Sequence, residues 1–520
     1  MERISSSTRK KSKVKPGGKS LDPSYYHDPQ PTLRVFLFNP CFKDQILTGN
    51  SNDLVFTPAV KQAQMIRAGQ ISSRDLVQAH LDQIERVDPS VNAMVTMVAE
   101  LALEQAAIAD EKQASGAELG PLHGLPIAIK DLQNTAGILT THGSPIYANN
   151  VPDSDALIVE RVKNAGAIVV GKSNTPEFGA GSQTFNSVFG TTKNPYDVTK
   201  TCGGSSGGAG VALACGMVPI ATGSDLGGSL RNPAAWSNVV GIRPAPGRVP
   251  AVGGDLGWST LSTDGPMGRT VADAAMQLAV VAGHDSRSPL SIEEDGSAFS
   301  QNLNRDFKGA RVAWSKSLGG RPIDVENSRV TEETKSVFVN LGCEIDETEP
   351  DLSTTDEIFQ TLRAYSFAIK HEQHLRNNRN QLKETVVWNA EQGMKLSAID
   401  VAHAEQLRTR LWEQLNEFFS TYEYLMLPVT SVPPFSNKQE YPTSVNGIEF
   451  ETYLDWMWPC YTISVTGLPA ISVPAGFTND GLPVGLQIVG RPQSELSLLQ
   501  IASAFEAETN HWKRRPVVVE

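Results

Sequence analysis

Short apolar runs alternate with helical stretches between Gly124 and Gly490, and this alternation constrains the fold more than any other feature of the chain. The runs are rich in β-branched residues and bounded by turn residues, as is typical of strands buried on both faces. They cover residues 125–130, 167–171, 218–222, 425–428, 470–474 and 484–489, and a helix is expected over 495–509. Because such runs occur at both ends of this span, we expect one α/β sheet that is shared by the whole chain and covered by helices on both faces.

Residues 1–52 form an extension that precedes this single domain, which we expect over residues 53–515. The first twenty residues are rich in Ser, Lys and Arg and lack the apolar stretch of a secretory signal, so a disordered tail is the first interpretation. A translation start placed too far upstream, an organelle transit segment and a nucleic-acid-binding arm are the alternatives. Within the domain, the polar and charged stretch around residues 285–415 is expected to be a mostly helical insertion.

Composition argues against several classes of protein. The 520 residues carry a net charge of −12, whereas nucleic acids and anionic membranes are bound by positively charged surfaces. No apolar run approaches the roughly 20 residues that span a bilayer. Five scattered cysteines without a C-x-x-C pair are typical of reduced intracellular thiols, and the one close histidine pair, His371 and His374, has no further ligand cluster nearby. We therefore expect a cytoplasmic protein with no metal or other cofactor and no nucleic-acid or membrane partner.

A glycine-rich window over residues 201–210 is the most unusual stretch of the chain. Its glycines allow the backbone to approach a ligand closely and to adopt positive φ. An apolar helix and strand follow at once, which disfavours a flexible linker, and no lysine follows the glycines as it would in a phosphate-binding loop of the Walker type. By itself, this window is compatible with a catalytic loop or an anion-binding loop.

A second glycine-rich turn, over residues 223–231, presents a serine at the end of an expected strand. This arrangement suits a nucleophile beside an oxyanion hole, because consecutive backbone N–H groups can point at one spot without obstruction by side chains. Ser229 would be the nucleophile, and the N–H groups of Leu226, Gly227, Gly228 and Ser229 would bind the oxyanion. The alternative is an ordinary glycine turn with a serine cap.

Lys130 is the candidate base for such a serine. No histidine stands at the spacing of a Ser-His-Asp elbow. Lys130 ends the apolar run 125–129, and burial lowers the pKa of a lysine because it disfavours the charged form. A neutral lysine is a competent general base for serine. The alternative is a solvated lysine at a strand end.

Taken together, these segments resemble the amidase signature family. Three blocks carry the resemblance, namely residues 124–131 (GLPIAIKD), 203–208 (GGSSGG) and 225–231 (DLGGSLR). Further similar segments are residues 140–144 (TTHGS), 171–178 (GKSNTPEF) and 467–470 (GLPA), so that the resemblance covers about residues 56–509. It implies a large mixed β-sheet covered by helices on both faces.

The resemblance also implies a mechanism for this chain. Lys130 would be the base, Ser205 a proton relay on a non-proline cis peptide, and Ser229 the nucleophile that forms an acyl-serine intermediate. Ser206 would be a supporting hydroxyl, whereas Asp225 and Arg231 would hold the loops without reacting. The expected reaction is cleavage of a carboxamide C–N bond to a carboxylate and an amine or ammonia.

The substrate is less constrained than the reaction. The aromatic cluster Tyr453, Trp456 and Trp458, together with Gly179, is expected to line a pocket for an apolar or aryl amide, unless these rings belong to the core. One alternative is the glutaminase (A-type) subunit of a tRNA-dependent amidotransferase, for which Asp455 lies in the expected area but no arginine segment matches. The other is a catalytically silent binding protein on the same fold. The expected partner is a small-molecule amide, and soluble members of the family suggest a homodimer.

Overall fold

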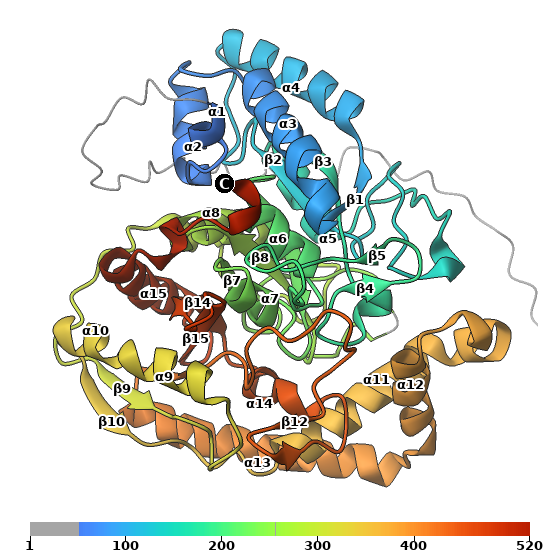
Figure 1. Ribbon diagram of the computed structural model, residues 1–520, viewed down its shortest axis with the longest axis vertical. Coiled ribbons are helices and arrows are strands. Elements are labelled where there is room, and N and C mark those ends of the chain that lie inside the picture. Colours follow the sequence, from blue (N-terminus) through green and yellow to red (C-terminus); the bar gives the residue numbers. More distant parts are fainter. Residues whose placement is uncertain (1–50, 255) are drawn as a thin grey trace, which may run out of the picture. The chain divides into compact units, whose positions relative to one another are not determined.

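Eleven strands form one mixed sheet in the computed structural model, which describes residues 51–254 and 256–520 (Figure 1). The disordered tail expected in the N-terminal extension therefore lies outside the described residues. In spatial order the strands are β1 (Met94–Met97), β3 (Ile168–Ser173), β2 (Pro126–Lys130), β6 (Ile220–Asp225), β8 (Thr263–Gly268), β7 (Val240–Arg243), β14 (Ala470–Phe477), β15 (Pro483–Gly490), β11 (Tyr424–Pro428), β9 (Arg311–Trp314) and β10 (Glu344–Glu347). The described part of the chain also has two small two-stranded sheets, β4–β5 (Phe185–Asn186, Gly190–Thr191) and β12–β13 (Ser444–Val445, Ile448–Glu449).

The pairing of these strands confirms the mixed sheet. Strand β2 lies parallel to β3 and β6, and β9 lies parallel to β10 and β11. The pairs β6–β8, β8–β7, β7–β14, β14–β15 and β15–β11 are antiparallel, as is the pair β1–β3. The six apolar runs of the sequence correspond to β2, β3, β6, β11, β14 and β15, and they come from both ends of the chain. One sheet is thus shared by most of the described chain.

Both faces of the sheet are covered, as the alternation of strand residues shows. On β2 and β3, Ile127 and Val169 belong to one core cluster, whereas Ala128 and Val170 belong to another. Successive side chains of a strand point to opposite faces, so the two clusters lie on opposite sides of the sheet. The same alternation continues at the far end, where Met426 packs in the first cluster and Leu427 in a third one.

Each face has its own set of helices. One face is covered by α2 (Ala59–Arg67), α5 (Leu157–Asn164), α8 (Val271–Val281), α9 (Val325–Glu333), α10 (Lys335–Asn340) and α15 (Glu495–Thr509). The other face is covered by α3 (Ser73–Val91), α4 (Ala99–Ala114), α6 (Gly207–Ala214) and α7 (Arg231–Trp236) and, at the far end, by α11 (Thr355–Asn378), α13 (Ala398–Thr421) and α14 (Trp458–Thr466). Helix α12 (Glu384–Lys395) packs against α11, and α1 (Ser51–Leu54) precedes α2. No described helix combines the length and the apolar character that a membrane span requires.

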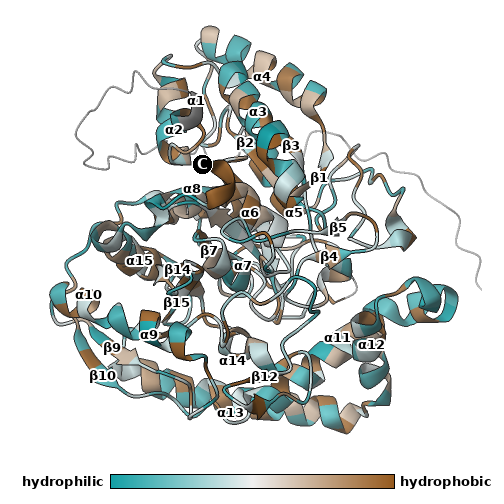
Figure 2. Cartoon of the chain, in the orientation of Figure 1, coloured by the Kyte–Doolittle hydropathy of each residue, from teal (hydrophilic) through white to brown (hydrophobic). Residues whose placement is uncertain are grey.

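The insertion expected around residues 285–415 differs from the prediction in its first part. Strands β9 and β10 lie within it and form the edge of the main sheet, so this part is a component of the sheet. The sequence signal is weak because β10 (EIDE) is mostly exposed and charged. The second part is helical, and Figure 2 shows hydrophilic residues prevailing where α11 and α12 meet at their outer ends.

Candidate active site

Lys130 is the last residue of β2, and its side chain is fully buried. Its Nζ lies 2.8 Å from the hydroxyl of Ser205, 2.8 Å from that of Ser206 and 3.0 Å from that of Ser224. Burial lowers the pKa of Lys130 to about 7, although the carboxylates of Asp264 and Asp225 favour the charged form. The amine can therefore be neutral near neutral pH while it contacts three hydroxyl groups.

The glycine-rich loop places two of these hydroxyls. Ser205 follows a cis peptide bond to Gly204, and Ser206 directly precedes α6. The loop is held from outside, because the Ser182 hydroxyl donates to the Gly204 carbonyl at 2.6 Å. A glycine is required at the start of α6, since a Cβ on Gly208 would lie 2.3 Å from the backbone nitrogen of Asn174. The glycines of this window thus allow close packing of the helix that presents the serines.

Ser229 lies in the turn between β6 and α7, and a buried carboxylate holds this turn. Asp225 accepts the backbone N–H of Gly228 at 2.8 Å and that of Leu230 at 3.2 Å. Burial would raise the pKa of Asp225, but the guanidinium groups of Arg231 and Arg243, at 2.9 and 3.1 Å, hold it well below its usual range. Asp225 is therefore ionised and fixes the backbone around Ser229.

The backbone N–H groups expected to form the oxyanion hole are not equivalent. The Gly228 N–H was expected to bind the oxyanion, but it already donates to Asp225. It therefore closes the turn instead. Within the described chain, the N–H groups of Leu226, Gly227 and Ser229 have no acceptor, and all three residues line the same pocket. The available donors are thus those of Leu226, Gly227 and Ser229.

Gly228→Ala is expected to destabilise the protein by about 2–4 kcal/mol, because positive φ and overpacking each cost on the order of 1–3 kcal/mol. Gly228 has φ +116°, and an added Cβ would lie 2.5 Å from Cys460 Cβ. Urea denaturation measures the change. Gly253→Ala is the matched control, because Gly253 also has positive φ but no atom within 4 Å of the added Cβ. Equal losses in the two variants would contradict the steric argument.

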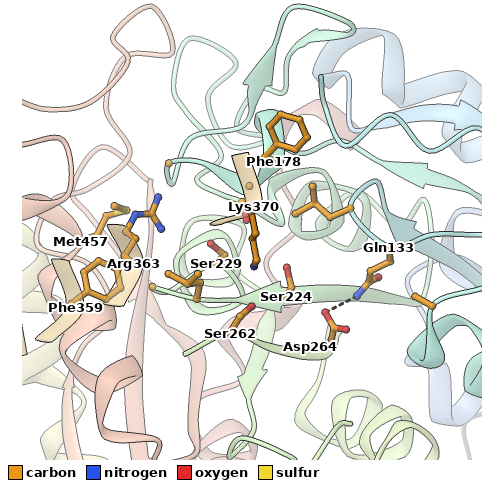
Figure 3. Close-up of a pocket in the computed structure, with 17 residues that line it drawn as sticks. Gln133, Phe178, Ser224, Ser229, Ser262, Asp264, Phe359, Arg363, Lys370 and Met457 are labelled. Carbon is orange, nitrogen blue, oxygen red and sulfur yellow. Dashed lines mark hydrogen bonds between the residues drawn. The ribbon is translucent and has the colours of Figure 1, made fainter. Parts of the chain in front are cut away.

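One cavity of about 290 Å³ brings Ser205, Ser224 and Ser229 together (Figure 3). The residues that line it are Leu132, Gln133, Ala156, Phe178, Gly179, Gly181, Ser205, Ser224, Leu226, Gly227, Ser229, Ser262, Asp264, Phe359, Arg363, Lys370 and Met457. No histidine is among them. Lys130 therefore provides the buried amine behind a pocket that contains hydroxyl groups and no imidazole.

The three aromatic residues expected in the pocket do not line it. Tyr453, Trp456 and Trp458 are at most 7% exposed and belong to the core between the sheet and α11, α13 and α14. Trp456 stacks on Trp236 at 5.4 Å between ring centroids, and the Trp458 indole donates to the Pro322 carbonyl. That expectation was wrong because aromatic clusters have the same appearance in a sequence whether they form a core or a pocket. Gly179 does line the pocket.

Several pocket residues had no place in the sequence-based expectation. Ser224 could have been found from the alternation of the strand, because it stands two residues after Thr222 on β6 and therefore points to the same face. The Lys130 backbone N–H donates to the Thr222 hydroxyl, and Lys130 Nζ donates to that of Ser224. Asp264 and Gln133 both line the pocket and are joined by a hydrogen bond of 3.1 Å. They come into contact because β8 pairs with β6, and this pairing cannot be predicted from the local sequence.

Residues 75–499 match the Amidase family. The chain belongs to the amidase signature family. An acylamidase of Rhodococcus erythropolis is 35% identical over 461 residues, which cover 88% of this chain and 96% of that protein. The A-type subunit of the glutamyl-tRNA(Gln) amidotransferase of Carboxydothermus hydrogenoformans is also 35% identical, over 89% of this chain and 99% of that protein.

Solved structures of the amidase signature family agree with this assignment. The crystal structure of a bacterial aryl acylamidase superposes with a TM-score of 0.81 and 27% identity, covering 88% of this chain and 98% of that one. A peptide amidase of Stenotrophomonas maltophilia superposes with a TM-score of 0.74, also at 27% identity, over 89% of this chain and 99% of that one. The protein is therefore an amide hydrolase.

Proposed function

We propose that this amidase signature enzyme cleaves amides by acyl transfer to Ser229, with Ser205 as proton relay and Lys130 as base. The observation that carries the proposal is the buried Lys130 amine, 2.8 Å from the Ser205 hydroxyl, behind a pocket that Ser205 and Ser229 line together. Burial lowers the pKa of Lys130 to about 7, which suits a base that works near neutral pH.

The protons can be followed through the site. A neutral amine has two N–H groups and one lone pair, so one of the three hydroxyls around Lys130 donates to it. Ser205 passes its proton to Lys130 and takes the proton of Ser229 as that oxygen attacks the carbonyl carbon. Ser205 then delivers a proton to the leaving nitrogen and regains one from the Lys130 ammonium, and the C–N bond breaks. Water repeats the route to release the carboxylate.

The negative charge on the carbonyl oxygen needs donors that are already in position. The N–H groups of Leu226, Gly227 and Ser229 supply them in this proposal, and Asp225 with Arg231 keeps the turn rigid behind them. Ser206 supports the site by contact with Lys130 at 2.8 Å, and its backbone N–H donates to the Ser229 carbonyl at 3.2 Å. These contacts join the two glycine-rich segments around the base.

The kcat/KM for a neutral amide is expected to rise with pH through about 7 and then to level off. The pKa of Lys130 lies near 7, so the amine is protonated and inactive as a base below this pH and neutral above it. Stopped-time assays between pH 5 and 9 measure the profile on a substrate without ionisable groups. A profile that falls as pH rises through 7 would contradict a neutral lysine base.

The apolar part of the pocket supports an apolar or aryl group on the substrate. Leu132, Phe178, Phe359 and Met457 line it, although they are not the aromatic residues expected from the sequence. The similarity to an acylamidase points in the same direction. Turnover of a series from acetamide through benzamide to acetanilide tests this preference, and equal kcat/KM for acetamide and acetanilide would argue against it.

The glutaminase subunit of a tRNA-dependent amidotransferase is a second candidate function, favoured by 35% identity to such a protein. The site gives it less support, because Asp455 accepts hydrogen bonds from Glu451 and Thr452 of its own loop and does not line the pocket. Glutamine hydrolysis in the presence of the other subunits of a bacterial amidotransferase, with no turnover of anilides, would favour this candidate over the first.

A further inference from the structure

The wall of the pocket formed by α11 is positively charged. Of the residues that line the pocket, Arg363 and Lys370 are cationic and come from α11, whereas Asp264 is the one acidic residue. They stand seven residues apart, which places them on the same face of the helix. Figure 3 shows the Arg363 guanidinium and the Lys370 side chain directed into the pocket, with Gln133 and Asp264 on the opposite side of the view.

Arg363 is built into the wall more firmly than a surface cation. Its side chain is 5% exposed, and its guanidinium donates to the Asn389 side-chain oxygen at 3.1 Å and to the Tyr453 hydroxyl at 2.9 Å. The guanidinium carbon lies 4.5 Å from the centre of the Phe367 ring. These contacts fix the planar group in one orientation, so that it can recognise a ligand with little loss of side-chain entropy.

The charge of Arg363 has no counterion within the described residues. Its neighbours in these contacts are neutral, and none of the ion pairs among the described residues includes Arg363. Neighbouring carboxylates have other partners. Glu440 is paired with Lys383 at 3.1 Å, and Asp264 accepts a hydrogen bond from Gln133. A buried charge without a partner is costly, and an anion beside it would offset that cost.

The two cations also act on the neighbouring histidine, although burial is the main cause of its pKa shift. Burial, His374, Lys370 and Arg363 together lower the pKa of His371 to about 3. His371 is thus neutral, and it adds no charge to the pair of cations. Only the smaller, coulombic part of this effect, from Lys370 and Arg363, would favour a bound carboxylate.

We propose that Arg363, assisted by Lys370 at the mouth, forms a carboxylate subsite, so that the preferred substrates are amides whose apolar or aryl group carries a carboxylate. This inference rests on the proposed acyl transfer at Ser229 and specifies the substrate of that site. Leu132, Phe178, Phe359 and Met457 contact the apolar part, and the guanidinium binds the carboxylate at its end.

Two matched pairs of anilides test the subsite in the full-length enzyme. In the first pair, 4-acetamidobenzoate is compared with 4-methylacetanilide, which has a methyl group in place of the carboxylate on the amine side. In the second pair, N-phenylsuccinamate is compared with butyranilide, which lacks the carboxylate on the acyl side. In at least one pair the anionic member should have a kcat/KM about 10- to 100-fold higher, the range expected for one charged hydrogen bond.

Arg363→Gln should abolish this preference for the anionic member, whereas Arg363→Lys should keep part of it. The matched control is Arg376→Gln on the same helix, because Arg376 is 71% exposed, pairs with Glu372 and does not line the pocket. Should Arg363→Gln fail to fold, Lys370→Gln replaces it, since Lys370 is exposed and its removal should lower the preference about threefold, within the range of an exposed ion pair.

The outcomes separate the subsite from the proposed function. Hydrolysis of the neutral anilides without any preference for the anionic ones would overturn the subsite and leave acyl transfer in place. A preference that survives in Arg363→Gln would overturn the assignment to Arg363. Calorimetric binding of 4-acetamidobenzoate or N-phenylsuccinamate to Ser229→Ala, abolished by adding Arg363→Gln, would support the subsite even if none of the four anilides were hydrolysed.

Discussion

Ser229→Ala is expected to lower kcat/KM for amide hydrolysis by about 10⁴- to 10⁶-fold, as for removal of the nucleophile in other serine hydrolases. The turn that carries Ser229 is held by Asp225, Arg231 and Arg243, none of which contacts the Ser229 hydroxyl, so the fold should be retained. Steady-state assays with acetanilide measure the loss, and urea denaturation shows whether stability is unchanged.

Ser224→Ala is the comparison variant for Ser229. Ser224 lines the same pocket, and its hydroxyl lies 3.0 Å from Lys130 Nζ. The substitution therefore perturbs the proposed base without removing the proposed nucleophile. We expect a loss of about 10- to 100-fold, similar to that of one supporting hydrogen bond to a charged or reacting group. If Ser224→Ala were as inactive as Ser229→Ala, and mass spectrometry located the acyl group on Ser224, the nucleophile would be Ser224.

Lys130→Met is expected to lower kcat/KM by at least about 10⁴-fold, because it removes the group that accepts the serine proton. Methionine has a similar length and suits a fully buried position, which limits the effect on packing. The rise in kcat/KM through pH 7 should disappear from the residual activity. Assays over the same pH range on purified, folded variant measure both effects.

Lys172→Met is the matched control for Lys130. Lys172 is also buried, on the neighbouring strand β3, and burial lowers its pKa to about 7 as well. Its amine donates to the Gln133 carbonyl and to the hydroxyls of Thr135 and Thr140, and it does not line the pocket. This variant should lose stability, by about 1–3 kcal/mol for the acceptors left unpaired, but at most about tenfold in kcat/KM. A comparable loss of activity in both variants would mean that any buried lysine in this sheet is required and would contradict a specific base role for Lys130.

The class of fold and the candidate groups of the site could be predicted from local sequence patterns. Buried strands such as residues 125–130 and 484–489 are continuous apolar runs, and this pattern depends only on local composition, so all six expected strands were confirmed. The glycine-rich segments around Ser205 and Ser229 were found for a similar reason. Their glycines permit backbone positions that other residues would obstruct, as the close contacts at Gly208 and Gly228 show.

Contacts between residues that are distant in the sequence could not be predicted in this way. Strand β10 was missed because an exposed edge strand such as EIDE has no apolar pattern, and its pairing comes from the rest of the sheet. Strand β9 (RVAW) is buried but has only four residues, which gives a short apolar run. Tyr453, Trp456 and Trp458 were expected in the pocket but lie in the core, because burial of an aromatic ring is favourable in either place. Asp264, Arg363 and Lys370 reach the pocket through the pairing of β8 and the packing of α11, which no local pattern of residues encodes. Local sequence patterns therefore predict the class of fold and the candidate groups of the site, whereas the charge and shape of the pocket depend on long-range packing.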